Sequence, residues 1–487
     1  MHSVWTVVGQ RLTRVVNSLY RKTEWRPFIQ GPALASCNRL LVQWKTTPML
    51  SITKFVPPKD SSYKLSKCII LAGCFAFFTS SALCLEKQLK STWEQLQEER
   101  KYRIKKAALE NGTLLTTFGL NLIGQLGQGH ERPADRPSPV EALSGKQIVY
   151  VAAGDSCTAA ISLNGDVYTW GSGEYGKLGH SDDSNENLPR LVEALKGKSI
   201  IKVSIGGNHM AAIDKDGHLY CWGRASSAGL GGTEHVYTPQ MIKGGLENEK
   251  VVSVSCGRSH TAAVTEKGEV WTWGNGYEGE LGHGEKISQY QPKKVQSLTE
   301  KVVDVACGRD FTIFVCESGL YSCGADDYGQ LGLGRSHGER FVQTPRSLSG
   351  TGLSDVVAIS AGDYHVCALG RDGLVYTWGL GREGQLGHGE KADCSLAKPV
   401  DNLRNFEIVQ VACGGGHTAA ITKDGVLYTW GRGRDGQLGR GGELESIAAY
   451  RTSPVQVTSL PAGTVLHVTL GSDHSAVLCQ DMKSKNS

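Results

Sequence analysis

A motif anchored on a glycine returns seven times along this chain and constrains what the chain can fold into. Its fullest copy runs from Gly257 to Gly282 and reads GRSHTAAV, TEKGEVWTWG and NGYEGELG. Aligned on the first glycine, the copies lie 51 to 57 residues apart and begin at Gly154, Gly206, Gly257, Gly308, Gly362, Gly414 and Gly471. A repeat of this length indicates supersecondary units that bury a core only by stacking on one another.

A second half-motif, an aromatic residue followed by glycine, alternates with the first. It occurs at Phe118, Trp170, Trp222, Trp273, Trp378 and Trp430, and Cys323 fills the remaining slot. The chain starts on this half and stops after the other, at His474 to Cys479. A complete last unit therefore needs strands from both ends of the chain. Such a unit closes a ring and leaves no open sheet edge.

The composition of each unit predicts β-structure. Short apolar and β-branched runs flank a dipeptide ending in glycine, such as Asn164-Gly165 or Asp216-Gly217, and these dipeptides favour tight hairpins. We expect Ala-Ala pairs such as Ala262-Ala263 on the innermost strands and the tryptophans in the wide gaps between blades. The predicted fold is all-β: a seven-bladed β-propeller over residues 112–480, closed by the N- and C-terminal strands.

Three sequence motifs of the repeat resemble those of a known family: Gly-x-x-His-[Thr/Ser]-Ala, x-Gly-x-Val-Tyr-Thr-Trp-Gly and Gly-Gln-Leu-Gly. They resemble the regulator-of-chromosome-condensation repeat, over about three quarters of the chain. The resemblance implies the propeller. It says little about function, because one fold hosts many functions.

The N-terminal quarter predicts mitochondrial targeting followed by a membrane anchor. Residues 1–45 are basic, hold Glu24 as their one acid and place apolar residues at near-helical spacing, as transit peptides do. Residues 46–67 read as a linker. Residues 68–85 contain no charge and are just long enough to span a bilayer as a helix. Lysines precede this span, so the positive-inside rule places the propeller in the intermembrane space of a single-pass inner-membrane protein.

Residues 86–111 contain neither Gly nor Pro and predict a charged helical stalk. We expect the stalk to be solvated, because its apolar stripe fades at Arg100. Residues 481–487 form a short tail. Asn111-Gly112-Thr113 has the form of a glycosylation sequon, which leaves open an anchor inserted in the secretory pathway.

Charge and cysteine usage exclude several classes of function. The chain carries +4 overall, but its basic residues are concentrated near the N-terminus, so residues 112–487 carry about −7. An acidic propeller is a poor ligand for phosphates, and we expect no nucleic-acid partner. The 14 cysteines show no metal or disulfide spacing and read as small buried hydrophobes.

Histidines recur at one repeat position, but we predict a structural role for them. His209, His260, His365, His417 and His474 share this position with Cys157 and Phe311. A slot that accepts Phe needs no lone pair, and residues related by blade rotation lie too far apart to share one ion. We expect each ring to bond a local turn. No nucleophile, phosphate-loop or metal motif appears, so the sequence predicts no enzyme, no cofactor and no metal.

The remaining candidate is a binding surface. The turns after each aromatic-Gly should share one face, and they combine charged residues with tyrosines, which are favoured in protein interfaces. These candidate residues are Glu174, Tyr175, Arg224, Tyr277, Glu278, Asp326, Asp327, Tyr328, Arg382, Glu383, Arg432, Arg434 and Asp435.

Two activities of the family do not match the residues. The founding member exchanges guanine nucleotides with a wedge inserted in a blade, whereas only a few extra residues occur here, near 349–354 and 441–450. The plant ultraviolet-B photoreceptor of the family uses Gly-Trp-Arg-His-Thr repeats, but Arg258, Asp363 and Gly415 stand at the Trp position here.

The layout of targeting segment, span and propeller resembles the fungal inner-membrane member of the family, which is linked to respiratory complex III assembly. It therefore predicts a non-catalytic membrane-anchored propeller that binds protein partners such as respiratory-chain subunits, with the lipid bilayer contacted through residues 68–85. The alternatives are guanine-nucleotide exchange on a mitochondrial GTPase, as in the animal mitochondrial member, and a scaffold on a membrane of the secretory pathway.

Overall fold

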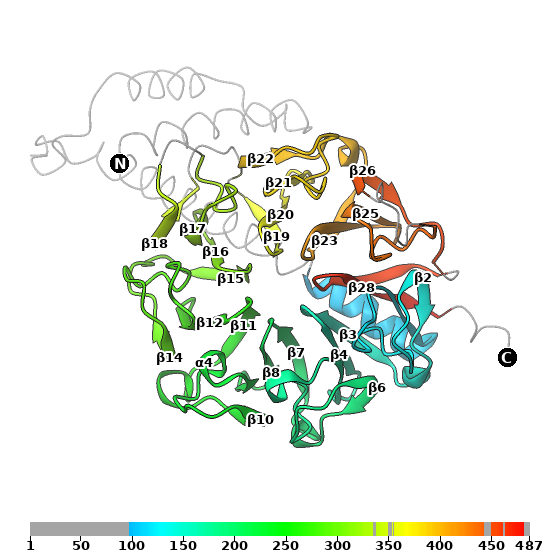
Figure 1. Cartoon of the computed structure of the whole chain (residues 1–487), viewed down its shortest axis with the longest axis horizontal. Coiled ribbons are helices and arrows are strands. Elements are labelled where there is room, and N and C mark those ends of the chain that lie inside the picture. Colours follow the sequence, from blue (N-terminus) through cyan, green and yellow to red (C-terminus); the bar gives the residue numbers. More distant parts are fainter. Residues whose placement is uncertain are drawn as a thin grey trace, which may run out of the picture. The chain divides into compact units, whose positions relative to one another are not determined.

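The computed structural model describes residues 97–334, 338–348, 353, 355–442, 450–460 and 463–481. Within them, seven four-stranded antiparallel sheets are arranged as blades around a central axis (Figure 1). The predicted seven-bladed all-β propeller is confirmed. The predicted transit segment, linker and membrane span, residues 1–85, lie outside the described residues. Among the helices that are described, none is long and apolar enough to cross a bilayer.

Each blade orders its four strands from the axis outwards. The innermost strands are β3 (Ile148–Ala153), β7 (Ile200–Ile205), β11 (Val251–Cys256), β15 (Val302–Cys307), β19 (Val356–Ala361), β23 (Ile408–Cys413) and β27 (Val465–Leu470). The second strands are β4 (Cys157–Ser162), β8 (His209–Asp214), β12 (His260–Thr265), β16 (Phe311–Cys316), β20 (His365–Gly370), β24 (His417–Thr422) and β28 (His474–Gln480).

The outer half of each blade follows the same scheme. The third strands are β5 (Val167–Gly171), β9 (Leu219–Gly223), β13 (Val270–Gly274), β17 (Gly319–Ala325), β21 (Val375–Gly379), β25 (Leu427–Arg432) and β1 (Thr113–Gly119). The fourth strands are β6 (Glu186–Leu191), β10 (Val236–Met241), β14 (Gln289–Lys294), β18 (Phe341–Ser347), β22 (Cys394–Pro399), β26 (Tyr450–Gln456) and β2 (Ala134–Pro139).

Short helical turns join some strands. They are η1 (Glu141–Leu143), η2 (Glu174–Gly176), η3 (Glu193–Leu195), α4 (Ala225–Ala228), η4 (Gly244–Leu246) and η6 (Asp401–Leu403).

The ring closes as the two half-motifs predict. Strand β1 pairs with β28 along its whole length, from Thr113 opposite Gln480 to Gly119 opposite His474. One blade therefore takes its inner strands from the C-terminus and its outer strands from the N-terminus. The sheet edges on either side of the closure are paired, which removes a site for edge-to-edge association.

The hairpin prediction is also confirmed, but the placement of the alanine pairs is wrong. Gly165 and Gly217 sit between second and third strands with φ of 84° and 90°, a region that favours glycine. Ala262 and Ala263, however, lie on β12, a second strand. Every residue of β12 is buried, whereas β11 has exposed positions, because a second strand is covered on both faces by neighbouring blades. The tight space is therefore between blades rather than at the axis.

The tryptophans fill the gaps between blades, as predicted, and they also hydrogen-bond across them. Trp430 of β25 is fully buried and its Nε1 donates to the carbonyl oxygen of Gln385, 2.9 Å away, in the preceding blade. Thr418 Oγ1 donates to the same oxygen at 2.7 Å. A Cβ on Gly387 would lie 2.8 Å from the indole Nε1, so the glycine leaves the room that the indole needs. The repeated cysteines are buried too, with Cys256 and Cys307 each 7% exposed.

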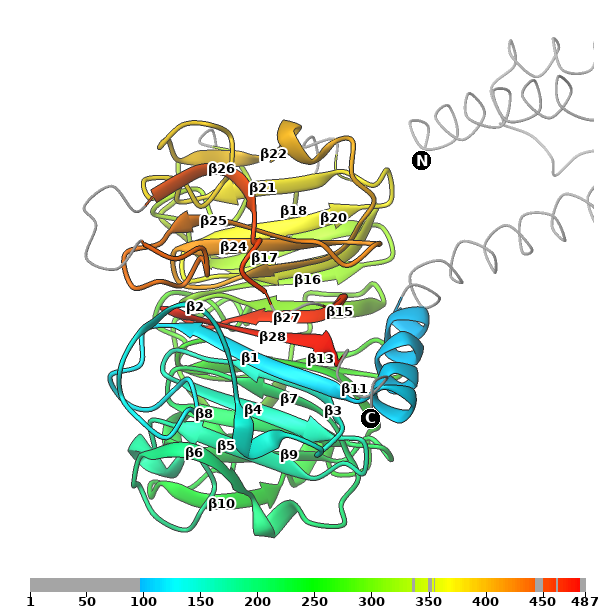
Figure 2. The same ribbon diagram turned by 90° about the vertical axis from the view of Figure 1, so that its right-hand side faces the viewer.

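Residues 97–110 form the predicted helix, but it is not a solvated stalk. Ile104 and Ala107 are buried in one cluster with Leu115 and Leu466, on the blade that closes the ring. The Arg100 side chain reaches the ring of His467, and burial lowers the pKa of Arg100 to about 10. Figure 2 shows this helix in blue along one face of the propeller. The apolar face that the helix buries lies after Arg100, where the sequence pattern had indicated that the apolar stripe ends.

Candidate binding face

Two sets of loops emerge on the face opposite the helix 97–110. Because neighbouring strands are antiparallel, the loops that follow the innermost strands and the third strands leave each blade on the same side. We call this side the loop face. Its inner loops are residues 155–156, 207–208, 258–259, 309–310, 363–364, 415–416 and 472–473. The described residues of its outer loops are 120–133, 172–185, 224–235, 275–288, 326–334, 338–340, 380–393 and 433–442.

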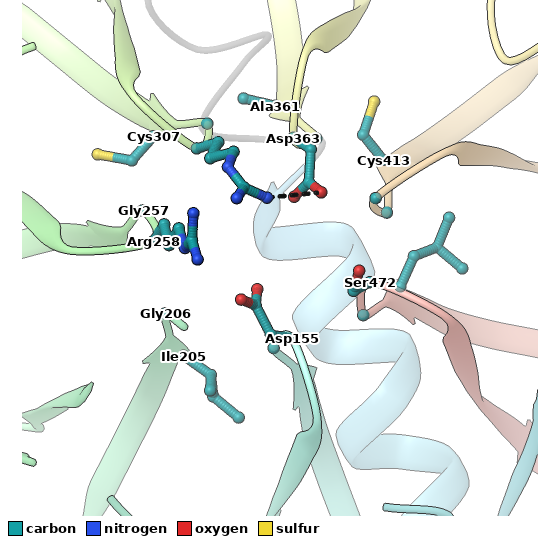
Figure 3. A pocket seen from close by; sticks show the side chains of 18 of the residues that line it. Asp155, Ile205, Gly206, Gly257, Arg258, Cys307, Ala361, Asp363, Cys413 and Ser472 are labelled. Carbon is teal, nitrogen blue, oxygen red and sulfur yellow. Dashed lines mark ion pairs between the residues drawn. The ribbon is translucent and has the colours of Figure 1, made fainter. Parts of the chain in front are cut away.

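The inner loops surround the mouth of the axial channel, where the repeat glycines meet. A Cβ on Gly257 would lie 2.4 Å from the carbonyl oxygen of Gly308 in the next blade, and one on Gly414 would lie equally close to that of Gly471. No side chain fits there, which explains the glycine that anchors the repeat. The glycines line a cavity of about 80 Å³ (Figure 3).

Charged side chains from four blades point into this mouth. Asp155, Arg258 and Asp363 are turned toward the axis (Figure 3). Arg309 Nη1 lies 3.7 Å from Asp363 Oδ2 and forms an ion pair with it. Burial raises the pKa of Asp363, and the negative charge of Asp155 raises it further.

Two of the predicted outer-loop residues, Tyr328 after β17 and Arg382 after β21, connect with the inner loops through ring contacts. Arg309 lies over the ring of Tyr364, 5.5 Å from its centroid. The rings of Tyr364 and Tyr328 meet edge to face at 5.2 Å, and Arg382 lies over Tyr328 at 5.3 Å. Arg382 also pairs with Asp393 at 3.1 Å. A continuous chain of contacts thus runs from the channel mouth to the rim.

The other predicted residues form smaller clusters on the same face. Arg224 lies over Tyr175 at 5.4 Å, and Arg434 lies over the ring of Tyr450 at 4.8 Å. Arg432 pairs with Glu383 at 3.8 Å. Asp327 pairs with Arg340 at 2.6 Å, while Tyr277 extends into solvent with 64% of its surface exposed. The remaining candidates, Glu174, Glu278, Asp326 and Asp435, lie in these outer loops as well.

Sequence reasoning missed the inner-loop members of the face. Arg309, Asp310, Tyr364 and Asp473 contribute to its ion pairs and ring contacts, yet they were not candidates. The signal for them was present: they occupy the two variable positions of Gly-x-x-His. Because strand β15 and its equivalents surround the axis, residues at these positions converge at the mouth.

The recurring histidines are structural elements of the ring, although their partner differs from the predicted local turn. His260 Nε2 lies 3.0 Å from Thr312 Oγ1 in the next blade. Thr312 Oγ1 donates its own hydrogen to the carbonyl oxygen of Glu280 at 2.8 Å, so His260 must be the donor. Burial lowers the pKa of His260 to about 4 and keeps the ring neutral. The same inter-blade bond joins His209 to Thr261 and His365 to Thr418.

Glu280 is a buried carboxyl at a position where most blades carry glutamine. It occupies the second place of the Gly-Gln-Leu-Gly string and has no exposed surface. Asn275 Nδ2 and the Glu278 backbone amide donate to it at 2.7 and 2.8 Å. Burial nevertheless dominates and raises the pKa of Glu280 to about 7.

One group of three potential metal ligands occurs among the described residues, Asp214, Asp216 and His218. His218 Nδ1 lies 2.9 Å from Asp214 Oδ2, and the amides of Asp216 and His218 donate to Asp214 Oδ1, each at 2.9 Å. These contacts account for Asp214 as the acceptor of a hairpin turn. The absence of a metal, a cofactor or catalysis stays a prediction.

A closed ring of seven repeated four-stranded blades defines a repeat β-propeller. The RCC1-like domain model matches residues 167–484, and models of the regulator of chromosome condensation (RCC1) repeat match residues 112–161 and 148–177. The chain therefore belongs to the RCC1 repeat family, as the resemblance implied.

Two relatives and one solved structure illustrate the spread of the family. The ultraviolet-B receptor UVR8 of Arabidopsis thaliana is 39% identical over 368 residues, which are 74% of this chain and 82% of UVR8. The mitochondrial RCC1 domain-containing protein RUG3 of Arabidopsis thaliana is 30% identical over 400 residues, 75% of this chain and 88% of RUG3. Prp20p from Saccharomyces cerevisiae superposes with a TM-score of 0.68 at 22% identity, covering 77% of this chain and 92% of Prp20p, and shows the shared fold.

Proposed function

We propose that this chain is a non-catalytic propeller, anchored in the mitochondrial inner membrane, that binds protein partners through its loop face and serves respiratory-complex assembly. The observation that carries the proposal is the chain of contacts from Arg309 through Tyr364 and Tyr328 to Arg382. Arginine and tyrosine side chains held in place by their neighbours lose little entropy on binding, and both residue types are enriched among interface residues that dominate affinity.

The position of the helix 97–110 supports the loop face as the binding side. The helix lies on the opposite face, where Ile104 and Ala107 are buried and Arg103 Nη1 donates to the Lys423 carbonyl at 3.2 Å. The chain therefore enters the propeller from the face that the helix covers. A partner can approach the loops without displacing it.

The proposed location rests on the basic, acid-poor residues 1–45 and the uncharged residues 68–85, and the mitochondrial relative RUG3 supports it. Protease protection of a C-terminally tagged chain in isolated mitochondria tests the location. Digestion of the tag only after rupture of the outer membrane supports the intermembrane space. A tag protected until the inner membrane is dissolved contradicts the topology, and a mass shift on deglycosylation of Asn111 would favour the secretory alternative.

Binding is tested by quantitative co-purification of the tagged full-length protein after chemical cross-linking in mitochondria. The loop-face variant Tyr277→Ala with Arg382→Ala should lose partners that the natural chain retains. The matched control, Phe406→Ala with Arg404→Ala on the opposite face, also removes one aromatic ring and one arginine from exposed positions and should retain these partners. Equal loss in both variants would contradict the proposal.

The same preparations separate assembly from nucleotide exchange. Respiratory subunits among the retained partners support the assembly role. Faster nucleotide release from a purified mitochondrial GTPase, weakened by charge reversal at Asp326 and Asp327, would support the exchange alternative instead.

A further inference from the structure

Three junctions between neighbouring blades contain the same kind of hydrogen bond near the axial channel. At each junction a cysteine ends the innermost strand of one blade, and its backbone amide donates to a serine hydroxyl on the innermost strand of the preceding blade. The pairs are Cys256 with Ser204, Cys307 with Ser255 and Cys413 with Ser360, each at 2.9 Å. This bond places each cysteine directly beside its serine.

The residue opposite the serine distinguishes one junction from the other two. Ser360 on β19 faces Cys367 on β20. The serines of the other two junctions face alanines instead, Ala211 and Ala262. Side chains of directly opposed residues in an antiparallel pair lie on the same face of the sheet, with Cβ atoms about 5 Å apart. The Cys367 side chain therefore points, beside Ser360, toward the blade that carries Cys413.

The thiols of Cys367 and Cys413 meet between these two blades. Both side chains belong to one buried cluster, with 0% and 6% of their surface exposed, and the two thiols interact as hydrogen-bond partners. At the other two junctions the thiol donates to the serine carbonyl oxygen, at 3.6 Å for Cys256 and 3.3 Å for Cys307. Among the strands that the structure describes, this is the one junction where an inner-strand cysteine meets a second-strand cysteine.

Cys413 also lies next to the axial cavity. It lines this cavity of about 80 Å³, with its sulfur turned away from the axis (Figure 3). A polar cavity of this size can hold small molecules such as water or hydrogen peroxide. Burial opposes ionisation of the Cys413 thiol, but the hydrogen bond with Cys367 and the nearby His365 ring outweigh burial and lower the pKa of Cys413. Burial raises the pKa of Cys367. Cys413 is thus the thiol that reacts first, because the thiolate is the nucleophile.

We propose that Cys367 and Cys413 form a thiol oxidation site, at which hydrogen peroxide joins the two blades through a disulfide bond. The Cys413 sulfur attacks one peroxide oxygen and becomes a sulfenic acid, while the O–O bond breaks and the leaving hydroxide takes the thiol proton to form water. The Cys367 sulfur then attacks the Cys413 sulfur. The S–O bond breaks, and the second hydroxide leaves as water with the Cys367 proton. The two thiols are oxidised and the peroxide is reduced to water.

This disulfide would tie β20 to β23 close to the inner loops of the loop face. A cross-link between strands of two blades restricts the unfolded chain, so we expect the oxidised protein to resist urea more than the reduced protein. The inference goes beyond the proposed function and does not depend on it.

Mass spectrometry of the full-length protein in mild detergent tests the site. After treatment with hydrogen peroxide, free thiols are blocked under denaturing conditions, and the chain is digested with trypsin without reduction. Cleavage after Lys and Arg places Cys367 as the one cysteine of peptide 347–371 and Cys413 as the one cysteine of peptide 405–423. These peptides should appear linked, and dithiothreitol should separate them. The cysteines of the other two junctions should remain reduced and become blocked.

Two variants separate the disulfide from a general effect of peroxide. Cys367→Ala copies the alanine of the other two junctions and should abolish the link. Peroxide should raise the urea midpoint of the natural chain by about 1 M and leave that of Cys367→Ala unchanged. The matched control Cys256→Ala removes a cysteine from the equivalent inner-strand position and should keep both the link and the shift in midpoint.

Complete blocking of Cys367 and Cys413 after peroxide treatment overturns the assignment. A link between other cysteines, such as Cys221 with Cys256, also overturns it, as does equal oxidation of all buried cysteines, because the junction then confers no selectivity. These measurements need no partner protein, so their failure would leave the proposed function untouched.

Discussion

The buried histidines that recur around the propeller make the free energy of unfolding depend on pH. The contribution of one of them, His260, can be measured separately. Its pKa is about 4 in the folded chain and about 6.5 when exposed. The unfolded state therefore binds more protons as pH falls, and stability is lost from about pH 6.5 down to about pH 4. Each pH unit in this window costs about 1.4 kcal/mol, so lowering the pH from 7.5 to 5 costs about 2 kcal/mol at this site.

The perturbation is His260→Phe, because Phe311 fills the equivalent slot in the next blade with no exposed surface. Removing the titrating ring should make the variant lose about 2 kcal/mol less stability than the natural chain between pH 7.5 and pH 5. Urea unfolding of the full-length protein in mild detergent, followed by tryptophan fluorescence, measures both losses.

His130→Asn serves as the control for the loss of a histidine, because the His130 side chain is exposed. Equal losses for His260→Phe and the natural chain would show that His260 is not held neutral by burial. The inter-blade bond to Thr312 would then need another explanation.

Three further predictions follow from other buried groups. Glu280→Gln, which copies Gln330 of the next blade, should raise stability at pH 7.5 by up to about 3 kcal/mol. That gain should shrink by pH 5, because a carboxyl with a pKa near 7 is unfavourable when ionised and neutral in acid; an undiminished gain in urea titrations would contradict this. Trp430→Phe should cost about 1–3 kcal/mol in the same titrations through a lost hydrogen bond and a smaller ring, and no loss would argue against its inter-blade role. Ile104→Ala should lower the free energy of unfolding by about 2–4 kcal/mol if the packing of the helix 97–110 on the closing blade stabilises the propeller. An unchanged urea midpoint would show that this packing contributes nothing to stability.

Periodicity made the architecture predictable. The seven glycines and the displaced half-motifs at Phe118 and His474 define both the number of blades and the way the ring closes. Glycine at these positions is required by backbone contact, as the 2.4 Å approach of a Gly257 Cβ to the Gly308 carbonyl shows. A steric requirement repeated at a fixed interval is visible in a single sequence.

Features that depend on contacts between blades were not predictable in the same way. The sequence places His260 and Thr312 in different repeats and says nothing of the bond between them. Ala262 was assigned to the wrong strand, because a small residue fits either a crowded axis or a crowded gap between sheets. The docking of Ile104 was missed for a related reason, since one apolar residue among charges indicates a buried face only once its partner surface is known.

The sequence identified only some of the residues that contact one another on the candidate face, and their role in binding stays a prediction. Tyr328 follows Cys323-Gly324 and Arg382 follows Trp378-Gly379, and both were identified because turns follow strands at a fixed offset. Their partners Tyr364 and Arg309 lie some 20 to 70 residues away along the chain and meet them only through the blade geometry.

The most direct test of protein binding through the loop face is site-specific photo-crosslinking in intact mitochondria. A photoreactive amino acid replaces Tyr277, which is 64% exposed on the loop face, or Phe406, which is 40% exposed on the opposite face. The account predicts a discrete cross-linked protein from position 277 and none from position 406. Cross-links from position 406 alone, or the same products from both positions, would contradict it.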